Sequence, residues 1–179
     1  MLFRSNRLCG EFSGDTEKKW YDELNAMAER SDIGANGVVY SPFIIDGKAS
    51  FSHLNIQTKL SDMVRAVMEG IAYEMLVSLQ EVEESIDVRI RRLYVSGGLT
   101  KSDVFNHILA DMYGIEIAKA SVNQDMVGTK GAAMIAGIGA GLFRDVRDAV
   151  DHMVEKNNEI VLPNEENHLR YRELIKTWK

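Results

Sequence analysis

The sequence predicts an α/β domain in which helices cover the faces of a sheet. Three observations lead to this prediction. Short apolar segments alternate with helical ones, a long amphipathic helix stands near the middle, and a glycine pair follows a short apolar strand. Such alternation is typical of sheets with helices packed on them. At 179 residues the chain can form one good core, so we expect residues 1–179 to form a single domain.

The composition is ordinary for a soluble globular domain, with 45% hydrophobic and 27% charged residues. The formal net charge of -6 disfavours binding to nucleic acid or to an anionic membrane, which both favour basic patches. Residues 1–7 lack the apolar run of a signal peptide, and Lys130 interrupts the apolar segment 127–143, so we expect no membrane span. The single cysteine, Cys9, excludes an internal disulfide and favours a cytoplasmic setting.

The first third of the chain is predicted to contain one helix and two strands. Apolar residues at helical spacing predict a helix over residues 16–30. β-branched and aromatic residues predict a strand that begins at Val38 and ends near Ile45. A second strand is expected from Phe51 to Ile56.

The strongest periodic pattern predicts a long amphipathic helix of about 25 residues, or roughly 38 Å. Its apolar stripe consists of Val64, Val67, Met68, Ile71, Met75, Leu79 and Val82. Charged residues, among them Arg65 and Glu69, lie elsewhere around this helix. Thr58 or Ser61 is the expected N-cap.

The second half is predicted to alternate again. A strand over residues 92–96 precedes the glycine pair, and Val104 to Met112 form a helix that Gly114 closes as a C-cap. A strand over residues 115–118 follows. Three further helices are then expected, over residues 128–142, over residues 146–153 and from Pro163 onward.

The glycine pair Gly97–Gly98 is the candidate ligand-binding element. It places backbone N–H groups and a helix N-terminus at the carboxyl end of a strand, where open α/β sheets commonly bind phosphate-bearing ligands. Taken alone, a glycine pair is more often a tight turn, and Thr100 or Ser102 then caps the following helix. The residues by themselves leave both interpretations open.

Other motifs point to no catalytic or metal site. The sequence has no Walker-type phosphate loop and no Gly-x-Gly-x-x-Gly fingerprint. Its four histidines are scattered without metal-ligand spacing, and Asp125 does not stand at the spacing of an Asp-Gly-Thr phosphate loop. Asp103 and Asp111 are expected on solvated helix faces, so no carboxylate is singled out as a general base.

Several segments together resemble the C-terminal domain of the FGGY family of carbohydrate kinases, and the xylulose kinases among them. The matching segments are Gly37–Phe43, Arg65–Tyr73, Ser96–Asp111, Gly131–Phe143 and the tail from Pro163 to Leu174. Members of this family transfer the γ-phosphoryl group of ATP to xylulose, ribulose, glycerol and related polyols. The resemblance implies an actin-like ATPase fold of ribonuclease H type, with a mixed sheet and helices on both faces.

The resemblance also implies the ligands of this chain. Gly97 and Gly98 would lie against the adenosine and the α-phosphate of ATP or ADP, and Ser102 would contact the nucleotide. Mg²⁺ would arrive with the nucleotide. A sugar or polyol would bind only together with a complementary N-terminal domain, which carries the sugar pocket and the catalytic aspartate in the family and is absent from these residues.

We therefore expect no catalytic residue in this chain and no phosphoryl transfer by the chain alone. An alternative is an orphan nucleotide-binding or self-associating module, because an exposed former domain interface favours a homo-oligomer. A third interpretation is an unrelated α/β domain in which Gly97–Gly98 is only a turn.

Overall fold

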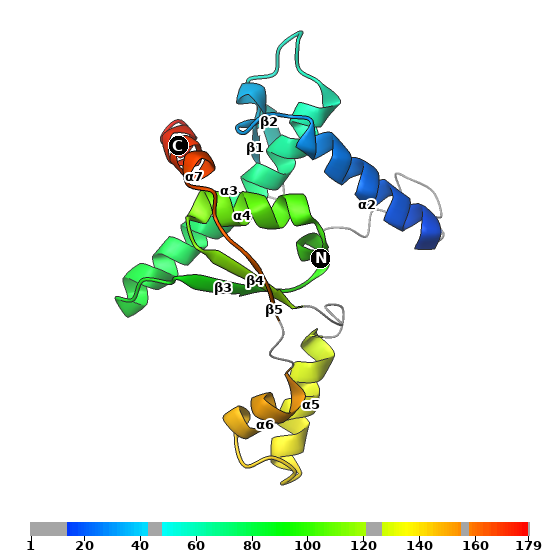
Figure 1. Ribbon diagram of the computed structural model, residues 1–179, viewed down its shortest axis with the longest axis vertical. Helices are drawn as coiled ribbons and strands as arrows, with labels where there is room; N and C mark the ends of the chain where they lie inside the picture. The colour runs from blue at the N-terminus through cyan, green and yellow to red at the C-terminus, as the bar shows by residue number, and fades with distance from the viewer. Residues whose placement is uncertain (1–13, 43–47, 121–126, 155–157, 179) are drawn as a thin grey trace. The chain divides into compact units, whose positions relative to one another are not determined.

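The computed structural model describes residues 14–42, 48–120, 127–154 and 158–178 (Figure 1). The chain divides into two compact units: residues 1–77 with 170–179 form unit 1, and residues 78–169 form unit 2. Cys9 and Asp125 lie outside the described residues.

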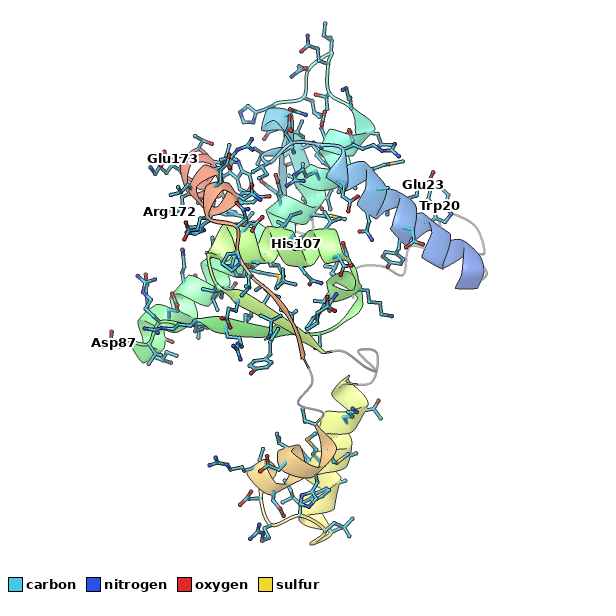
Figure 2. The ribbon with its side chains drawn as sticks, in the orientation of Figure 1. Trp20, Glu23, Asp87, His107, Arg172 and Glu173 are labelled. Atoms are coloured by element: carbon cyan, nitrogen blue, oxygen red, sulfur yellow. The ribbon has the colours of Figure 1, made fainter. Side chains whose placement is uncertain are left out.

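Unit 1 begins with helix α2 (Gly14–Glu29), as the sequence predicts. Trp20 and Glu23 lie on this helix with exposed side chains (Figure 2). A short 3-10 helix, η1 (Ala35–Gly37), leads from the end of α2 toward the first strand.

Two short strands, β1 (Val39–Ser41) and β2 (Ser50–Ser52), form an antiparallel pair in unit 1. The rings of Tyr40 and Phe51 face each other across it, with their centroids 4.9 Å apart. The predicted end of the first strand near Ile45 lies outside the described residues. The second strand was expected to reach Ile56 and is shorter, because His53 has a φ of 61°, which is not an extended conformation.

The long helix α3 (Leu60–Ile86) packs closely against β1. Ala35, Val38 and Ala66 form a small apolar core, with Tyr40 packed against it. At Gly70 the helix approaches the strand so closely that a Cβ atom would overlap the carbonyl oxygen of Tyr40. This position therefore requires glycine for space.

The start of α3 differs from the prediction. The helix begins at Leu60, and the carboxylate of Asp62 accepts the backbone N–H of Lys59 at 2.9 Å. Thr58 accepts the N–H of Asn55 instead, and Ser61 lies inside the helix, so neither is the cap. Asp62 takes this position because an acidic side chain in the first turn can return to the free N–H before the helix.

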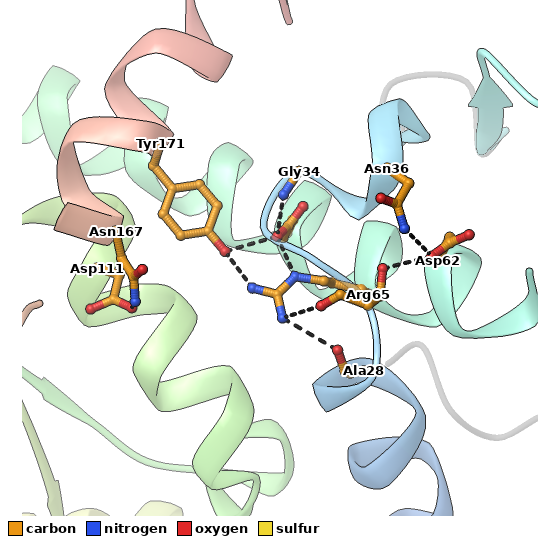
Figure 3. A network of polar contacts seen from close by, with 10 residues as sticks. Ala28, Gly34, Asn36, Asp62, Arg65, Asp111, Asn167 and Tyr171 are labelled. Carbon is orange, nitrogen blue, oxygen red and sulfur yellow. Dashed lines mark hydrogen bonds and ion pairs between the residues drawn. The ribbon is translucent and has the colours of Figure 1, made fainter. Parts of the chain in front are cut away.

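Arg65 and Glu69 are buried, although the sequence places them away from the apolar stripe of α3. Arg65 Nε donates to Glu69 Oε1 at 2.7 Å (Figure 3). The hydroxyl of Tyr171, on helix α7 (Glu165–Ile175), donates to the same oxygen at 2.8 Å and accepts from Arg65 Nη2 at 3.0 Å. Burial raises the pKa of Glu69, while these donors and the N–H of Gly34 oppose the rise.

The same arginine holds the chain after α2 in place. Arg65 Nη1 donates to the carbonyl oxygens of Ala28 and Ser31, each at 3.2 Å. The hydroxyl of Ser31 and the amide of Asn36 both donate to Asp62, at 2.7 and 2.8 Å. Polar side chains of α3 thus fix both α7 and the segment between α2 and β1.

Unit 2 contains a mixed three-stranded sheet in the order β3 (Arg92–Val95), β4 (Glu116–Ala120), β5 (Asn158–Val161). β3 and β4 are parallel, as strands joined through a crossover helix should be, and β5 runs antiparallel to β4. The sequence predicts the first two strands and misses β5. Its four residues include only two β-branched side chains, so its pairing with β4, and not its own pattern, establishes it.

Helix α4 (Asp103–Tyr113) lies on one face of this sheet (Figure 1). Its buried apolar residues are Val104, Phe105, Ile108, Leu109, Ala110 and Met112, and the facing strand residue Ile117 is fully buried. Gly114 ends the helix in a left-handed conformation, with φ 68°, as predicted.

Asp111 is buried, and its predicted place on a solvated face is wrong. Its two carboxylate oxygens accept the N–H of Asn164 and the side-chain amide of Asn167, each at 2.8 Å. A solvated carboxylate and a buried, paired one occur at the same helical spacing, so the pattern alone does not separate them. Asp103 is exposed as predicted and pairs with Lys119 at 2.6 Å.

Helices α5 (Val127–Gly139) and α6 (Val146–Met153) pack against each other, and both confirm the prediction. The small residues of α5 suggested close contacts. Gly137 makes one, against the ring of Phe143, whereas a Cβ at Gly131 would meet no described atom within 4 Å. No helix in the described ranges is long and apolar enough to cross a bilayer.

We predict opposite effects of alanine at two helical glycines. Gly70→Ala should lower the free energy of unfolding by about 1–3 kcal/mol, because the new methyl group collides with the backbone of β1. Gly131→Ala, the matched control in open space, should raise helix stability by up to about 1 kcal/mol. Urea denaturation followed by circular dichroism measures both, and a Gly70→Ala variant as stable as the parent chain would contradict this packing.

Candidate functional site

The segment Ser96–Ser102 connects the end of β3 to the start of α4, all within unit 2. Gly97 has φ 110° and ψ −178°, a conformation that side-chain-bearing residues rarely adopt. Gly98 then begins a 3-10 helix, η2 (Gly98–Lys101). We call Gly97–Lys101 the glycine turn. The sequence predicts α4 directly after the glycines, and the structure inserts η2 between them.

Hydrogen bonds to the carbonyl oxygen of Gly97 close the glycine turn. The backbone N–H of Thr100 donates to this oxygen at 3.2 Å, and the Thr100 hydroxyl donates to it at 2.8 Å. Thr100, which is itself part of the glycine turn, is buried. The first N–H groups of a helix, here those of Gly98 and Leu99, have no acceptor within the helix itself.

Ser102 is the N-cap of α4. Its hydroxyl oxygen accepts the backbone N–H of Phe105 at 3.1 Å, and the residue is buried. The interpretation of Ser102 as a helix cap is therefore confirmed. Its contact with a nucleotide stays a prediction.

The outer side of the glycine pair is open. A Cβ atom built on Gly97 or Gly98 would have no heavy atom of the described residues within 4 Å. Outside their immediate chain neighbours, the described residues therefore leave space for an added methyl group at either glycine. Among the described residues, no packing contact requires glycine at position 98.

The charges beside the turn are mostly paired. Lys119 Nζ lies 2.6 Å from Asp103 and 3.1 Å from Glu159, at the start of α4 and on β5. Burial lowers the pKa of Lys119, but the two carboxylates outweigh it and the pKa is raised. Lys101 ends η2 with an exposed side chain.

The described residues contain no cluster of three or more histidines, cysteines or carboxylates that could hold a metal ion. The predicted arrival of Mg²⁺ with the nucleotide stays a prediction.

Sequence reasoning missed one residue of the site. Asn106, on the first turns of α4, is fully buried and donates from its amide to the carbonyl oxygen of Thr100 at 2.9 Å. A polar residue among the apolar positions Phe105 and Leu109 was the available signal. His107, its exposed neighbour on α4, points to solvent (Figure 2).

Comparison with known families decides the relationship. Residues 22–140, more than half of the chain, match the model of the FGGY family of carbohydrate kinases, C-terminal domain. The chain belongs to this family. The FGGY match contains the glycine turn, all of the buried polar residues of α3 and all of α4.

Curated relatives include two kinds of FGGY kinase. A xylulose kinase of Staphylococcus epidermidis is 26% identical over 172 residues, covering 91% of this chain and 34% of that protein. A gluconokinase of Bacillus licheniformis is 29% identical over 165 residues, covering 87% of this chain and 31% of that protein. The chain spans about a third of the length of the curated relatives it matches.

Solved structures of FGGY kinases share the fold. A ligand-bound xylulose kinase from Lactobacillus acidophilus superposes with a TM-score of 0.73 at 19% identity, covering 88% of this chain and 33% of that one. A Plasmodium falciparum glycerol kinase with ADP gives a TM-score of 0.67 at 19% identity, covering 89% and 34%. The predicted actin-like fold is confirmed.

The backbone of the glycine turn leads to a prediction about stability. Gly97→Ala should lower the free energy of unfolding by about 1–3 kcal/mol, because alanine disfavours a φ of 110°. Gly98→Ala, the neighbouring control with ordinary φ and open space, should change it by less than about 0.5 kcal/mol. Chemical denaturation compares the two, and equal effects would show that the turn has another conformation.

Proposed function

We propose that this chain is the nucleotide-binding part of a carbohydrate kinase, and that its glycine turn receives the adenosine and α-phosphate of Mg-ATP or Mg-ADP. The residues in contact would be Gly97, Gly98 and Ser102. One observation carries the proposal: an FGGY C-terminal domain presents an open glycine pair at the carboxyl end of β3. We further propose that residues 1–179 act as one domain, corresponding to most of the family's C-terminal domain.

Two further observations support a nucleotide as the ligand. The carboxyl ends of strands in α/β sheets are the usual place for phosphate-bearing ligands. In addition, one of the solved structures with this fold, the Plasmodium falciparum glycerol kinase, is a complex with ADP. The open backbone of Gly98 allows a planar ring to pack on it, as a side chain at this position would not.

The reaction of the whole kinase divides its tasks between residues. A sugar or polyol hydroxyl forms a bond to the γ-phosphorus of ATP, the bond to the β-phosphate oxygen breaks, and the hydroxyl proton passes to a base. Protein groups in such transfers mainly position the reactants and stabilise charge. Near the glycine turn, the carboxylate of Asp103 is paired with Lys119, and we do not assign it as that base.

By its resemblance to the family, the chain would hold the nucleotide and leave proton removal to another domain. We further propose a cytoplasmic location, which the single cysteine favours, and a homo-oligomer, which an exposed former domain interface would favour.

Binding of Mg-ADP tests the proposed site. Millimolar Mg-ADP should raise the melting temperature of the chain, because a ligand that binds only the folded state stabilises it by about 2.7 kcal/mol at a hundredfold excess over Kd. Gly98→Ala should fold as the parent chain does and lose most of this shift, since its methyl group stands where the ligand approaches. If Mg-ADP leaves the melting temperature of the parent chain unchanged, the proposal is wrong.

The division of tasks is tested by turnover. In a coupled ADP-release assay with Mg-ATP, the purified 179-residue chain should show no release above the nucleotide-only background with pentuloses or glycerol. A full-length FGGY kinase assayed in parallel controls for the coupling enzymes. Sugar-dependent ADP release by the chain alone would contradict the assignment of the base to another domain.

A further inference from the structure

Asn106 is a polar residue fully buried in unit 2, and it lies under the glycine turn. Its side-chain amide donates to the carbonyl oxygen of Thr100 at 2.9 Å, and its backbone N–H donates to the carbonyl oxygen of Ser102 at 3.1 Å. The side chain thus connects α4 to the last part of η2, across six positions in sequence.

The other end of this amide is unsatisfied. Asn106 Oδ1 is buried and has no hydrogen-bond partner among the described residues. A buried oxygen without a partner is unfavourable by about 1–3 kcal/mol, whereas leucine would fill a similar space without this cost. The need to fill the core therefore does not explain an asparagine at this position. The side-chain amide of Asn106 makes its hydrogen bond to Thr100.

That contact leads directly to the glycine pair. Asn106 holds the carbonyl of Thr100, and the Thr100 hydroxyl holds the carbonyl of Gly97 at 2.8 Å. The bond from Asn106 to Thr100 is buried, and the bond from Thr100 to Gly97 is partly buried. The orientation of the Gly97–Gly98 peptide relative to α4 is set by this two-step connection.

We propose that Asn106 is a positioning residue for nucleotide binding, acting through Thr100 to hold the glycine turn in its binding conformation. The inference rests on the proposed function, because it assumes that the turn receives a nucleotide. A turn that is fixed before the ligand arrives binds more tightly, since less conformational freedom is lost on binding.

Two pairs of variants and one control test this proposal in the full chain, with isothermal titration of Mg-ADP and the melting temperature as readouts. Asn106→Leu should weaken Mg-ADP binding about tenfold or more while its melting temperature stays close to that of the parent, because the orphan oxygen disappears with the amide. Asn106→Asp keeps the shape, loses the donor and should weaken binding as well.

The second pair acts at the next step of the connection. Thr100→Val removes the hydroxyl bond to Gly97 and should weaken binding, and Thr100→Ser keeps it and should bind as the parent does. The control is Asn167→Ala, which removes a side-chain amide bond outside the glycine turn, to the carboxylate of Asp111. It should lower the melting temperature and leave the Kd for Mg-ADP unchanged.

The outcomes separate the inference from the function on which it rests. If the parent chain does not bind Mg-ADP, the proposed function fails and this inference with it. If the parent binds and both Asn106→Leu and Thr100→Val bind equally well, only the inference is overturned. It is also overturned if Asn167→Ala loses as much affinity as Asn106→Leu, because affinity would then merely follow stability. Should the Asn106 variants not fold, the comparison of Thr100→Val with Thr100→Ser decides alone.

Discussion

The buried ion pair between Arg65 and Glu69 is the interaction on which the rest of unit 1 depends. Removing two charges from water is costly, and it is tolerated only when further hydrogen bonds satisfy them. The chain supplies these bonds from three places: Tyr171 on α7, the N–H of Gly34 and the carbonyl oxygens that follow α2. Because the apolar core of unit 1 is small, this polar cluster determines where α7 and the loop before β1 must lie.

Unit 2 uses the same principle to shape its glycine turn. Its sheet and α4 have a conventional apolar core, but the backbone after β3 is held by Thr100 and Asn106, both buried and polar. Apolar packing determines which faces of two helices or strands are in contact. Directed hydrogen bonds also determine the orientation of individual peptide groups. The proposed binding of a nucleotide through the backbone of the turn would need the second kind of control.

The sequence predicts the helices, which follow from apolar periodicity, and the turn, which follows from its glycine pair. Helices α3, α4, α5 and α6 repeat their apolar residues clearly, and the position of Gly97–Gly98 after β3 is legible from the chain alone. The sequence does not predict the strands and buried side chains that depend on contacts with residues far along the chain. β5 exists through pairing with β4, and the buried carboxylates of Glu69, through Oε1, and Asp111 accept hydrogen bonds from partners far along the chain. The Asn106 contact depends on η2, a turn that the sequence does not predict.

The most direct test of the account is where Mg-ADP acts on the chain. A ¹⁵N-labelled sample titrated with Mg-ADP should show its largest backbone amide shift changes at Gly97, Gly98 and Leu99, with smaller ones at the start of α4. Adenosine alone should shift the same amides more weakly. Shift changes centred on another segment, or none at saturating Mg-ADP, would contradict the claim that the glycine turn is the nucleotide site.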